Sequence, residues 1–226
     1  MSVADPPGTD RLSARVRAET QVHHEAAQGS GFLDALAAGR LPLAAYADLA
    51  VQHFVVYDTL ERAGREMAGD PVAGDFVRPE LDRVPALAAD LGFLVGPDWP
   101  DTIAPLPPTV EYRERLRAVA FDRASAFLAH HYTRYLGDLS GGQYLGPAIA
   151  RTYRLTGDGH RFFAFEGIRP PAFRTAYRRM LDRIVWPRAE EDAFVAEVSE
   201  AYRLNIAMLA GLNERWACGT DGAGRE

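Results

Sequence analysis

Apolar residues recur along most of the chain at the three- and four-residue spacing of amphipathic helices. No segment alternates apolar and polar residues over six positions, so strands are not expected. The expected helices span 10–28, 43–67, 85–91, 109–154, 171–184 and 188–216. The pattern predicts one all-α domain over residues 11–216, with an N-terminal extension at 1–10 and a flexible tail at 217–226.

Helix-breaking residues set the ends of these segments. Asp10 is suited to cap the first helix, and Gly29-Ser30-Gly31 ends it. Pro42 sits at the start of the long second helix, which Gly69-Asp70-Pro71 ends. Five prolines between residues 96 and 108 predict an ordered loop there.

Composition narrows the classes of function. The chain has 226 residues and a formal net charge of −6, which argues against a nucleic-acid partner. No apolar run approaches the roughly 20 residues that span a bilayer, and the first residues lack the pattern of a secretion signal. The single cysteine, Cys218, cannot form an internal disulfide. A soluble cytoplasmic protein without a membrane partner is therefore expected.

A glycine-rich break, YLGDLSGGQ at 135–143, interrupts a strong helical pattern. Each glycine inside a helix costs about 1 kcal/mol relative to alanine, which favours a special reason for Gly137, Gly141 and Gly142. Gly137 and Gly141 share a helix face and leave a shelf that a flat ligand could approach, and Gly142 gives room for a kink. A helix cap, a close helix crossing and a plain loop remain alternatives. Asp138 lies within helical pairing reach of Arg134.

Two adjacent histidines in the first helix fall on different faces. His23 shares the apolar stripe of Leu12 and Val16, so it is expected to face the core. His24 shares a polar stripe with Arg17, Gln21 and Gln28, which suits a metal ligand at the edge of a cleft. Gln28 could accept a hydrogen bond from the second ring nitrogen of His24. The alternative is a surface face with two incidental histidines.

The segment HHYTRYLGDLSGGQ, residues 130–143, closely resembles the distal-helix signature of heme oxygenases. The similarity extends over nearly all of 12–216. It implies a fold in which heme b lies between the N-terminal helix and the kinked glycine-rich helix. In that register His24 is the proximal iron ligand, and Gln28 stands where the family has glutamate.

The resemblance also implies roles for residues around the heme. Tyr57, Arg134, Asp138 and Asn205 would organise water beside iron-bound dioxygen. Gly137, Ser140, Gly141 and Gly142 would contact the ring. The expected anchors of the heme carboxylates are Arg17, Tyr132, Arg174 and Arg178, with arginine at two positions where the family has lysine.

By this resemblance heme is both cofactor and substrate, and the chain binds no flavin or nucleotide. Dioxygen and electrons from a ferredoxin or an NAD(P)H-dependent reductase would convert heme, through attack on its α edge, to biliverdin, carbon monoxide and ferrous iron.

Three alternative functions compete with this interpretation. A heme carrier or sensor would keep the fold without turnover. A thiamin-degrading hydrolase of similar architecture needs a reactive cysteine in its pocket, and Cys218 lies in the tail. A di-iron bundle needs paired Glu-x-x-His motifs, which the sequence lacks. Ser140 has no partner base in sequence and no Gly-x-Ser-x-Gly elbow, so a hydrolytic serine is not expected.

Overall fold

The computed structural model describes residues 11–22 and 31–217, and all regular elements in those ranges are helical. The α-helices are α1 (Leu12–Glu19), α3 (Gly31–Ala37), α4 (Leu43–Met67), α5 (Val84–Leu94), α6 (Trp99–Thr102), α7 (Pro107–Val119), α8 (Ala124–Gly137), α9 (Gln143–Thr152), α10 (Pro170–Leu181) and α11 (Arg188–Ala217). The short elements are the 3₁₀ helices η1 (Gly74–Phe76), η2 (Pro79–Leu81) and η4 (Arg161–Phe163), and the π-helix η3 (Asp138–Gly142). The predicted all-α class is confirmed.

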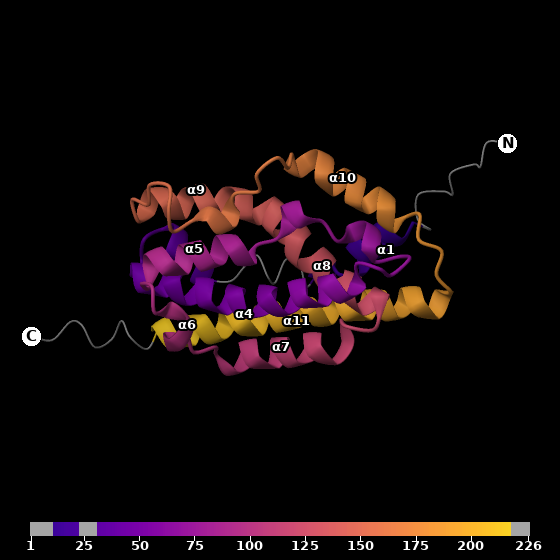
Figure 1. Cartoon of the computed structure of the whole chain (residues 1–226), viewed down its shortest axis with the longest axis horizontal. Coiled ribbons are helices and arrows are strands. Elements are labelled where there is room, and N and C mark those ends of the chain that lie inside the picture. The colour runs from indigo at the N-terminus through magenta and orange to yellow at the C-terminus, as the bar shows by residue number, and fades with distance from the viewer. Residues whose placement is uncertain (1–10, 23–30, 218–226) are drawn as a thin grey trace, which may run out of the picture.

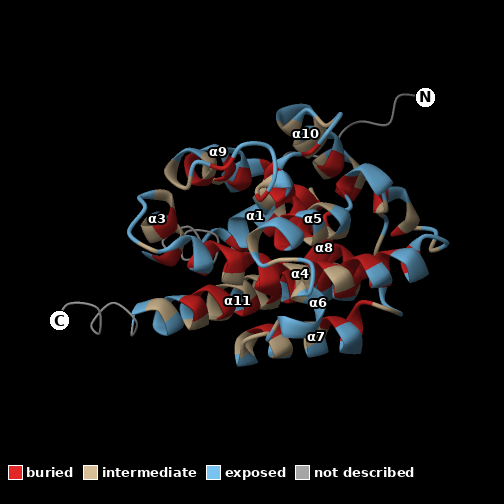
Figure 2. Ribbon diagram, turned by 60° about the vertical axis from the view of Figure 1, so that its left-hand side comes forward, coloured by how far each residue is buried: buried red, intermediate tan, exposed pale blue. Residues whose placement is uncertain are grey.

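Three helices, α4, α8 and α11, form the centre of the molecule (Figure 1). Helix α11 packs along α8 and α7, while α4 packs along α5 and α7. The inward faces of the central helices are buried, whereas α7 shows an exposed outer face (Figure 2). Tyr57, Phe127 and Phe194 are among the largest fully buried side chains, one from each central helix. Burying a side chain of this kind contributes roughly 1.5–3 kcal/mol, so these contacts hold the bundle together.

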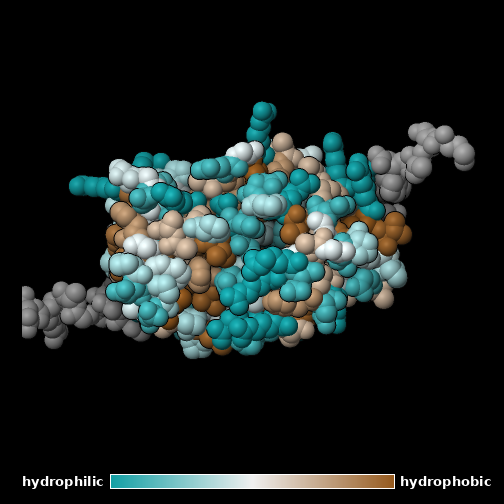
Figure 3. Space-filling model, viewed as in Figure 1, coloured by the Kyte–Doolittle hydropathy of each residue, from teal (hydrophilic) through white to brown (hydrophobic). Residues whose placement is uncertain are grey.

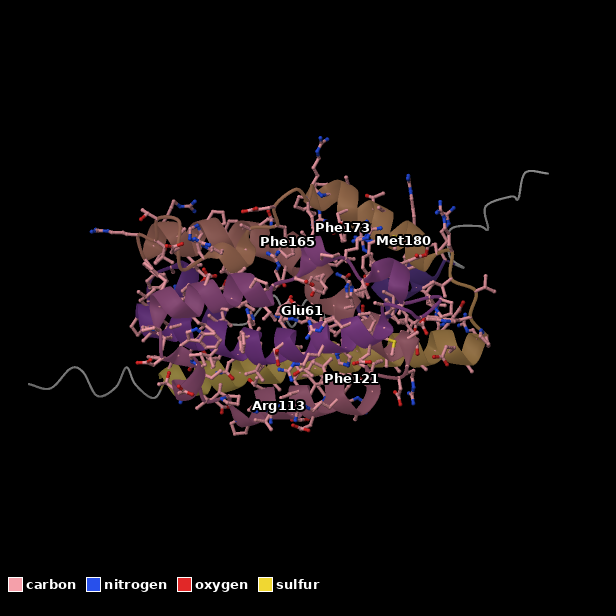
Figure 4. The ribbon with its side chains drawn as sticks, in the orientation of Figure 1. Glu61, Arg113, Phe121, Phe165, Phe173 and Met180 are labelled. Carbon is pink, nitrogen blue, oxygen red and sulfur yellow. The ribbon has the colours of Figure 1, made fainter. Side chains whose placement is uncertain are left out.

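Helices α9 and α10 lie on the side of the central helices opposite α7 (Figure 1). Figure 4 shows the same separation, with Arg113 of α7 at one edge and Phe173 of α10 at the other. Helix α10 is tied to α1 by Ser13, whose backbone N–H and hydroxyl both donate to Asp182, at 2.9 and 3.0 Å. This contact fixes the first described helix beside α10.

The prediction of one helix over 109–154 was wrong. Helix α7 ends at Val119, and α8 begins after Arg123, whose φ of −127° and ψ of 108° are extended. No glycine or proline marks this break, so residues 120–123 turn without a breaker in the sequence. The glycine-rich break was foreseen, and it takes the form of η3, a π-helical insertion that joins α8 directly to α9.

Two further boundaries differ from expectation. The proline-rich stretch 96–108 is not all loop, because it holds α6 and the first turn of α7, where Pro100, Pro107 and Pro108 lie at positions that need no N–H donor. The first helix does not run unbroken to residue 28, since α1 ends at Glu19 and the Thr20 hydroxyl donates to the Val16 carbonyl at 2.7 Å. Its N-cap is Arg11, while Asp10 lies outside the described residues.

Charged side chains cover much of the outer surface. Figure 3 shows hydrophilic side chains gathered over the middle of one face, with hydrophobic side chains in separate patches. On α7, Arg113 and Arg117 pair with Glu114, and Arg115 pairs with Glu197 of α11. The arginines of α7 therefore form ion pairs within the protein. Within the described ranges, no helix combines the length and the apolar character needed to cross a membrane.

Candidate functional site

Two adjoining cavities open along the end of α8 and η3. The glycine cavity, of about 410 Å³, is lined by residues that include Arg134, Asp138, Gly141 and Asn205. The arginine cavity, of about 420 Å³, is lined by residues that include Arg17, Tyr132, Arg174 and Arg178. Both are lined by Gly137, Ser140 and Tyr202, so the two volumes meet along one wall. Each has the size of a typical small-molecule pocket, which spans about 300–1,000 Å³.

The wall of the glycine cavity carries two glycines without packed neighbours, Gly137 and Gly141, and Gly137 also lines the arginine cavity. A Cβ added at Gly137 or at Gly141 would meet no described atom within 4 Å. The backbone of Gly137 has ordinary helical angles, with φ of −61° and ψ of −52°, so these glycines are not required by conformation. Their effect is to let a ligand approach the main chain. Gly142 differs, since its Cβ would lie 3.4 Å from the Phe163 ring on the packed side.

Four polar side chains, from α4, α8, η3 and α11, meet at the glycine cavity. The Tyr57 hydroxyl donates a hydrogen bond to Oδ2 of Asp138. Arg134 Nη1 donates to Oδ1 of Asn205 at 2.5 Å, and its guanidinium carbon lies 5.0 Å from the centroid of the Tyr57 ring. No ion pair joins Arg134 to Asp138, although both are described and their spacing allowed one. The hydroxyl of Tyr57 therefore donates to the carboxylate of Asp138, and the amide oxygen of Asn205 accepts from Arg134.

The electrostatics of this cluster leave donors free for a ligand. Burial raises the pKa of Asp138, while the Arg134 charge and the hydrogen bond from Tyr57 oppose that rise. Burial, followed by the Asp138 charge, raises the pKa of the Tyr57 hydroxyl well above its ordinary value, so Tyr57 keeps its proton. Nε and Nη2 of Arg134 are buried and have no hydrogen-bond partner among the described residues. Buried donors of this kind are normally satisfied by water or a ligand.

The arginine cavity gathers three guanidinium groups. Arg174 Nη1 donates to the Leu139 carbonyl at 3.0 Å and to the Ser140 hydroxyl at 2.7 Å, which ties α10 to the π-helix. Nε of Arg178 is buried without a described partner. Burial raises the pKa of Tyr132, and the charges of Arg178 and Arg17 act against that rise. Since none of these three arginines forms an ion pair within the described part of the chain, the cavity suits an anionic ligand with carboxylates.

Two of the predicted site residues, His24 and Gln28, lie outside the described residues, as does His23. The described residues on either side do line the cavities: Thr20 and Gln21 line the arginine cavity, and Leu33 and Asp34 line the glycine cavity. All the other predicted site residues either line one of the two cavities or, in the case of Tyr57, bond a residue that does.

Sequence reasoning missed two polar side chains beside the cluster. His53 of α4 lines the glycine cavity one helical turn before Tyr57, and that spacing was the available signal. Tyr112 of α7 is fully buried, its hydroxyl has no described partner, and burial raises its pKa to about 12. The charges of Arg134 and Asp138 both act on Tyr112, which places its hydroxyl near the same cluster.

The fold and the cavities suit one class of ligand, which is flat enough to lie against bare backbone and has an acidic edge that arginines could bind. Heme fits this description, because it is planar and carries two carboxylates at one edge. The model of the family described as heme oxygenase matches residues 10–211. The chain belongs to the heme oxygenase family, and that prediction is confirmed.

Relatives named heme oxygenase are similar to this protein over most of the chain. "Heme oxygenase 2" of Synechocystis sp. is 30% identical over 208 residues, covering 90% of this chain and 83% of the relative. "Heme oxygenase 1" of Gallus gallus is 31% identical over 207 residues, covering 90% and 70%. The solved structure of heme oxygenase-1 from Synechocystis sp. PCC6803 in complex with heme has a TM-score of 0.87 at 28% identity, covering 93% of this chain and 96% of that one. Heme oxygenase from Leptospira interrogans has a TM-score of 0.83 at 32% identity, covering 88% and 98%.

Proposed function

We propose that this protein is a heme oxygenase that binds heme as both cofactor and substrate and cleaves it to biliverdin, carbon monoxide and ferrous iron. The observation that carries the proposal is the adjoining pair of cavities, one backed by glycines and one lined by arginines that form no ion pair with another described residue. Dioxygen and electrons from a ferredoxin or an NAD(P)H-dependent reductase complete the reaction. The expected cytoplasmic location stays a prediction.

Bound heme supplies the redox-active iron and the ring carbon that is oxidised, and the chain supplies position and protons. The bare backbone at Gly137 and Gly141 would let the ring contact the main chain at the end of α8 and in η3. Asp138 holds water in the glycine cavity, and the hydrogen bond from Tyr57 fixes the direction of its carboxylate. Arg134, held by Asn205, presents its two remaining donors to that water.

His24 is proposed as the iron ligand, with Gln28 accepting from its second ring nitrogen. The placement is supported by the neighbouring residues 20–21 and 33–34, which line the cavities on both sides of the segment. In His24→Ala the axial-nitrogen signal in electron paramagnetic resonance of ferric heme should be lost together with turnover. His23→Ala is the matched control and should keep both. Loss only in the His23 variant would place the ligand one residue earlier.

Arg17, Tyr132, Arg174 and Arg178 are proposed to hold the heme carboxylates and so to present the α edge for attack. Changing Arg174 and Arg178 together to glutamine should give a mixture of biliverdin isomers, measured by chromatography. Arg179→Gln is the control, because Arg179 lies on the same helix but is exposed and lines neither cavity. A single unchanged isomer from the double variant would remove these arginines as anchors.

Reconstitution with heme, ascorbate and dioxygen tests the function itself. The expected result is loss of the heme Soret band and appearance of biliverdin, with carbon monoxide released in equal amount. Tight heme binding without biliverdin, repeated with a ferredoxin and its reductase, would make the protein a heme carrier instead.

A further inference from the structure

We propose that His53 is a positioning residue of the glycine cavity, whose ring accepts a hydrogen bond from a water that Arg134 also binds. The inference rests on the proposed function and adds a residue to it. His53 belongs to α4 and lines the cavity together with Arg134 and Asp138, which come from α8 and its π-helical continuation. The family signature at 130–143 does not include His53, and its spacing of one helical turn from Tyr57 is the one sequence feature that points to it.

The Tyr57 ring contacts both His53 and Arg134 beside the glycine cavity. The His53 ring meets Tyr57 edge-on, with centroids 6.5 Å apart and planes at 82°. The Arg134 guanidinium lies over the face of the same tyrosine ring at 5.0 Å. Phe162 of η4 also packs against the His53 ring, with centroids 4.9 Å apart. The imidazole is therefore held by aromatic contacts, while its polar atoms remain available to the cavity.

The imidazole is neutral in the folded protein. Burial, together with the nearby Arg134 charge, lowers the pKa of His53 well below its ordinary value. The charged and titratable groups around the cavity are Tyr57 on the same helix, Arg134 of α8 and Asp138 of η3. The cavity is also lined by Asp34 of α3, Tyr144 of α9, and Tyr202 and the polar Asn205 of α11. A neutral ring has one N–H donor and one bare acceptor nitrogen. His53 is consequently an acceptor for hydrogen bonds near neutral pH and not a source of protons.

Unused hydrogen-bonding groups on the two side chains are complementary. Nε and Nη2 of Arg134 are donors without a described partner. The His53 ring forms no hydrogen bond to another described residue, and its described contacts are with the rings of Tyr57 and Phe162. A water can accept from Arg134 and donate to the bare nitrogen of His53, and buried waters are held by two to four such partners. Its second hydrogen can then point to the Asp138 carboxylate.

This arrangement gives His53 a distinct role. Asp138 exchanges protons with cavity water, whereas His53 fixes where that water sits relative to Arg134. A residue that only filled space between Tyr57 and Phe162 would serve equally well as phenylalanine. If His53 accepts a hydrogen bond, glutamine should preserve its role and phenylalanine should not. The two substitutions therefore separate positioning from packing.

The test compares the wild-type protein with His53→Phe and His53→Gln. In the heme-free wild-type protein, nitrogen-15 NMR of histidine should show a neutral His53 tautomer with one bare nitrogen from pH 5.5 to 8. In the ferric heme complex, the pH midpoint of the optical acid–alkaline transition should shift by about half a unit or more in His53→Phe, the scale of one lost hydrogen bond. It should return to within half that shift in His53→Gln.

Turnover and affinity complete the comparison. Biliverdin yield per heme should fall about 3- to 10-fold in His53→Phe, the scale of a lost hydrogen bond, and recover in His53→Gln. Heme affinity should stay within about twofold in both, because the proposed partner is water. A midpoint and yield that do not change in His53→Phe would overturn the proposal, as would a His53→Gln variant that behaves like the phenylalanine variant. Absence of biliverdin from the wild-type protein would reject the enzymatic function alone, since the NMR and optical measurements still test His53.

Discussion

Two regions of the molecule use an aspartate and a glycine for opposite purposes. In the cavity wall, Asp138 accepts one hydrogen bond from Tyr57 and otherwise faces the glycine cavity. In the contact between α5 and η4, both oxygens of Asp90 accept backbone N–H groups, from Arg161 and from Phe162, each at 2.8 Å. Burial raises the pKa of both aspartates. The Asp138 carboxylate can therefore accept further hydrogen bonds from a ligand or water, whereas both oxygens of Asp90 already accept backbone N–H groups at the start of η4.

The glycines differ in the same way. A Cβ at Gly141 would meet no described atom within 4 Å, whereas a Cβ at Gly146 of α9 would lie 2.5 Å from the Phe163 Cβ. Gly141 leaves space for a ligand, and Gly146 lets α9 pack directly on η4. The same residue types thus line an open cavity in one region and form a packed contact in the other, and the two regions differ in whether neighbouring atoms fill the space beside them.

Substitutions of the two aspartates should give the largest difference between the two regions, in activity for Asp138 and in stability for Asp90. Asp138→Asn should lower biliverdin formation by about 10²–10⁴-fold, the usual contribution of a placed proton-handling group. Heme affinity and thermal stability should stay the same or rise slightly, because a buried charge is removed. Single-turnover product analysis with calorimetry measures both quantities.

Asp90→Asn is the matched control and should show the reverse behaviour. Asparagine can accept only one of the two N–H bonds, and an unsatisfied buried donor costs about 1–3 kcal/mol. Its stability should therefore fall while the activity of the folded fraction is retained. Equal losses of activity in the two variants would show that Asp138 has no special role.

The glycine pair should give the next largest effect. Gly146→Ala forces α9 away from Phe163, and overpacking of this kind costs about 1–3 kcal/mol in the free energy of unfolding. Gly141→Ala should leave the melting temperature unchanged or higher, since alanine favours helix by up to about 1 kcal/mol. It should weaken heme binding, because its methyl group enters the glycine cavity. Thermal unfolding and heme titration of both variants check the crossed pattern, and unchanged heme affinity in Gly141→Ala would place the ring elsewhere.

Sequence reasoning worked where one physical signal dominated. Apolar periodicity predicted α4 and α11 nearly to the residue, and the glycine-rich stretch marked η3. It failed where tertiary contacts decide, as at the break after Val119, which contains no glycine or proline. His53 was missed because a histidine on a buried helix face looks like a core residue until the cavity beside it is known. The pattern likewise allowed an Arg134–Asp138 pair, but Tyr57 and Asn205 from other helices displaced it.

The smallest expected effect is on the pH dependence of stability, and it comes from a third buried carboxylate, Glu61 of α4 (Figure 4). Its Oε1 accepts the backbone N–H groups of Arg83 and Val84, at 2.5 and 3.0 Å, so it serves the start of α5 and not the cavity. Burial raises the pKa of Glu61 to about 7, although those two hydrogen bonds oppose the rise. The folded state therefore binds this proton more tightly than the unfolded state. The contribution is present below the unfolded pKa and is lost as the pH rises toward 7.

Glu61→Gln keeps an acceptor oxygen for both N–H groups but cannot ionise, so it isolates this titration. At pH 3.5, below the unfolded pKa of about 4.5, the two proteins should unfold with nearly equal free energy, because Glu61 is largely protonated in both the folded and the unfolded state. At pH 8 the variant should be more stable by about 1–3 kcal/mol, since the wild-type protein must bury a charge there. The other acids with raised pKa are common to both proteins and cancel in the difference. Urea unfolding across this pH range measures it, and parallel pH profiles would mean that the hydrogen bonds from Arg83 and Val84 outweigh burial, so that Glu61 is ionised in the folded protein throughout.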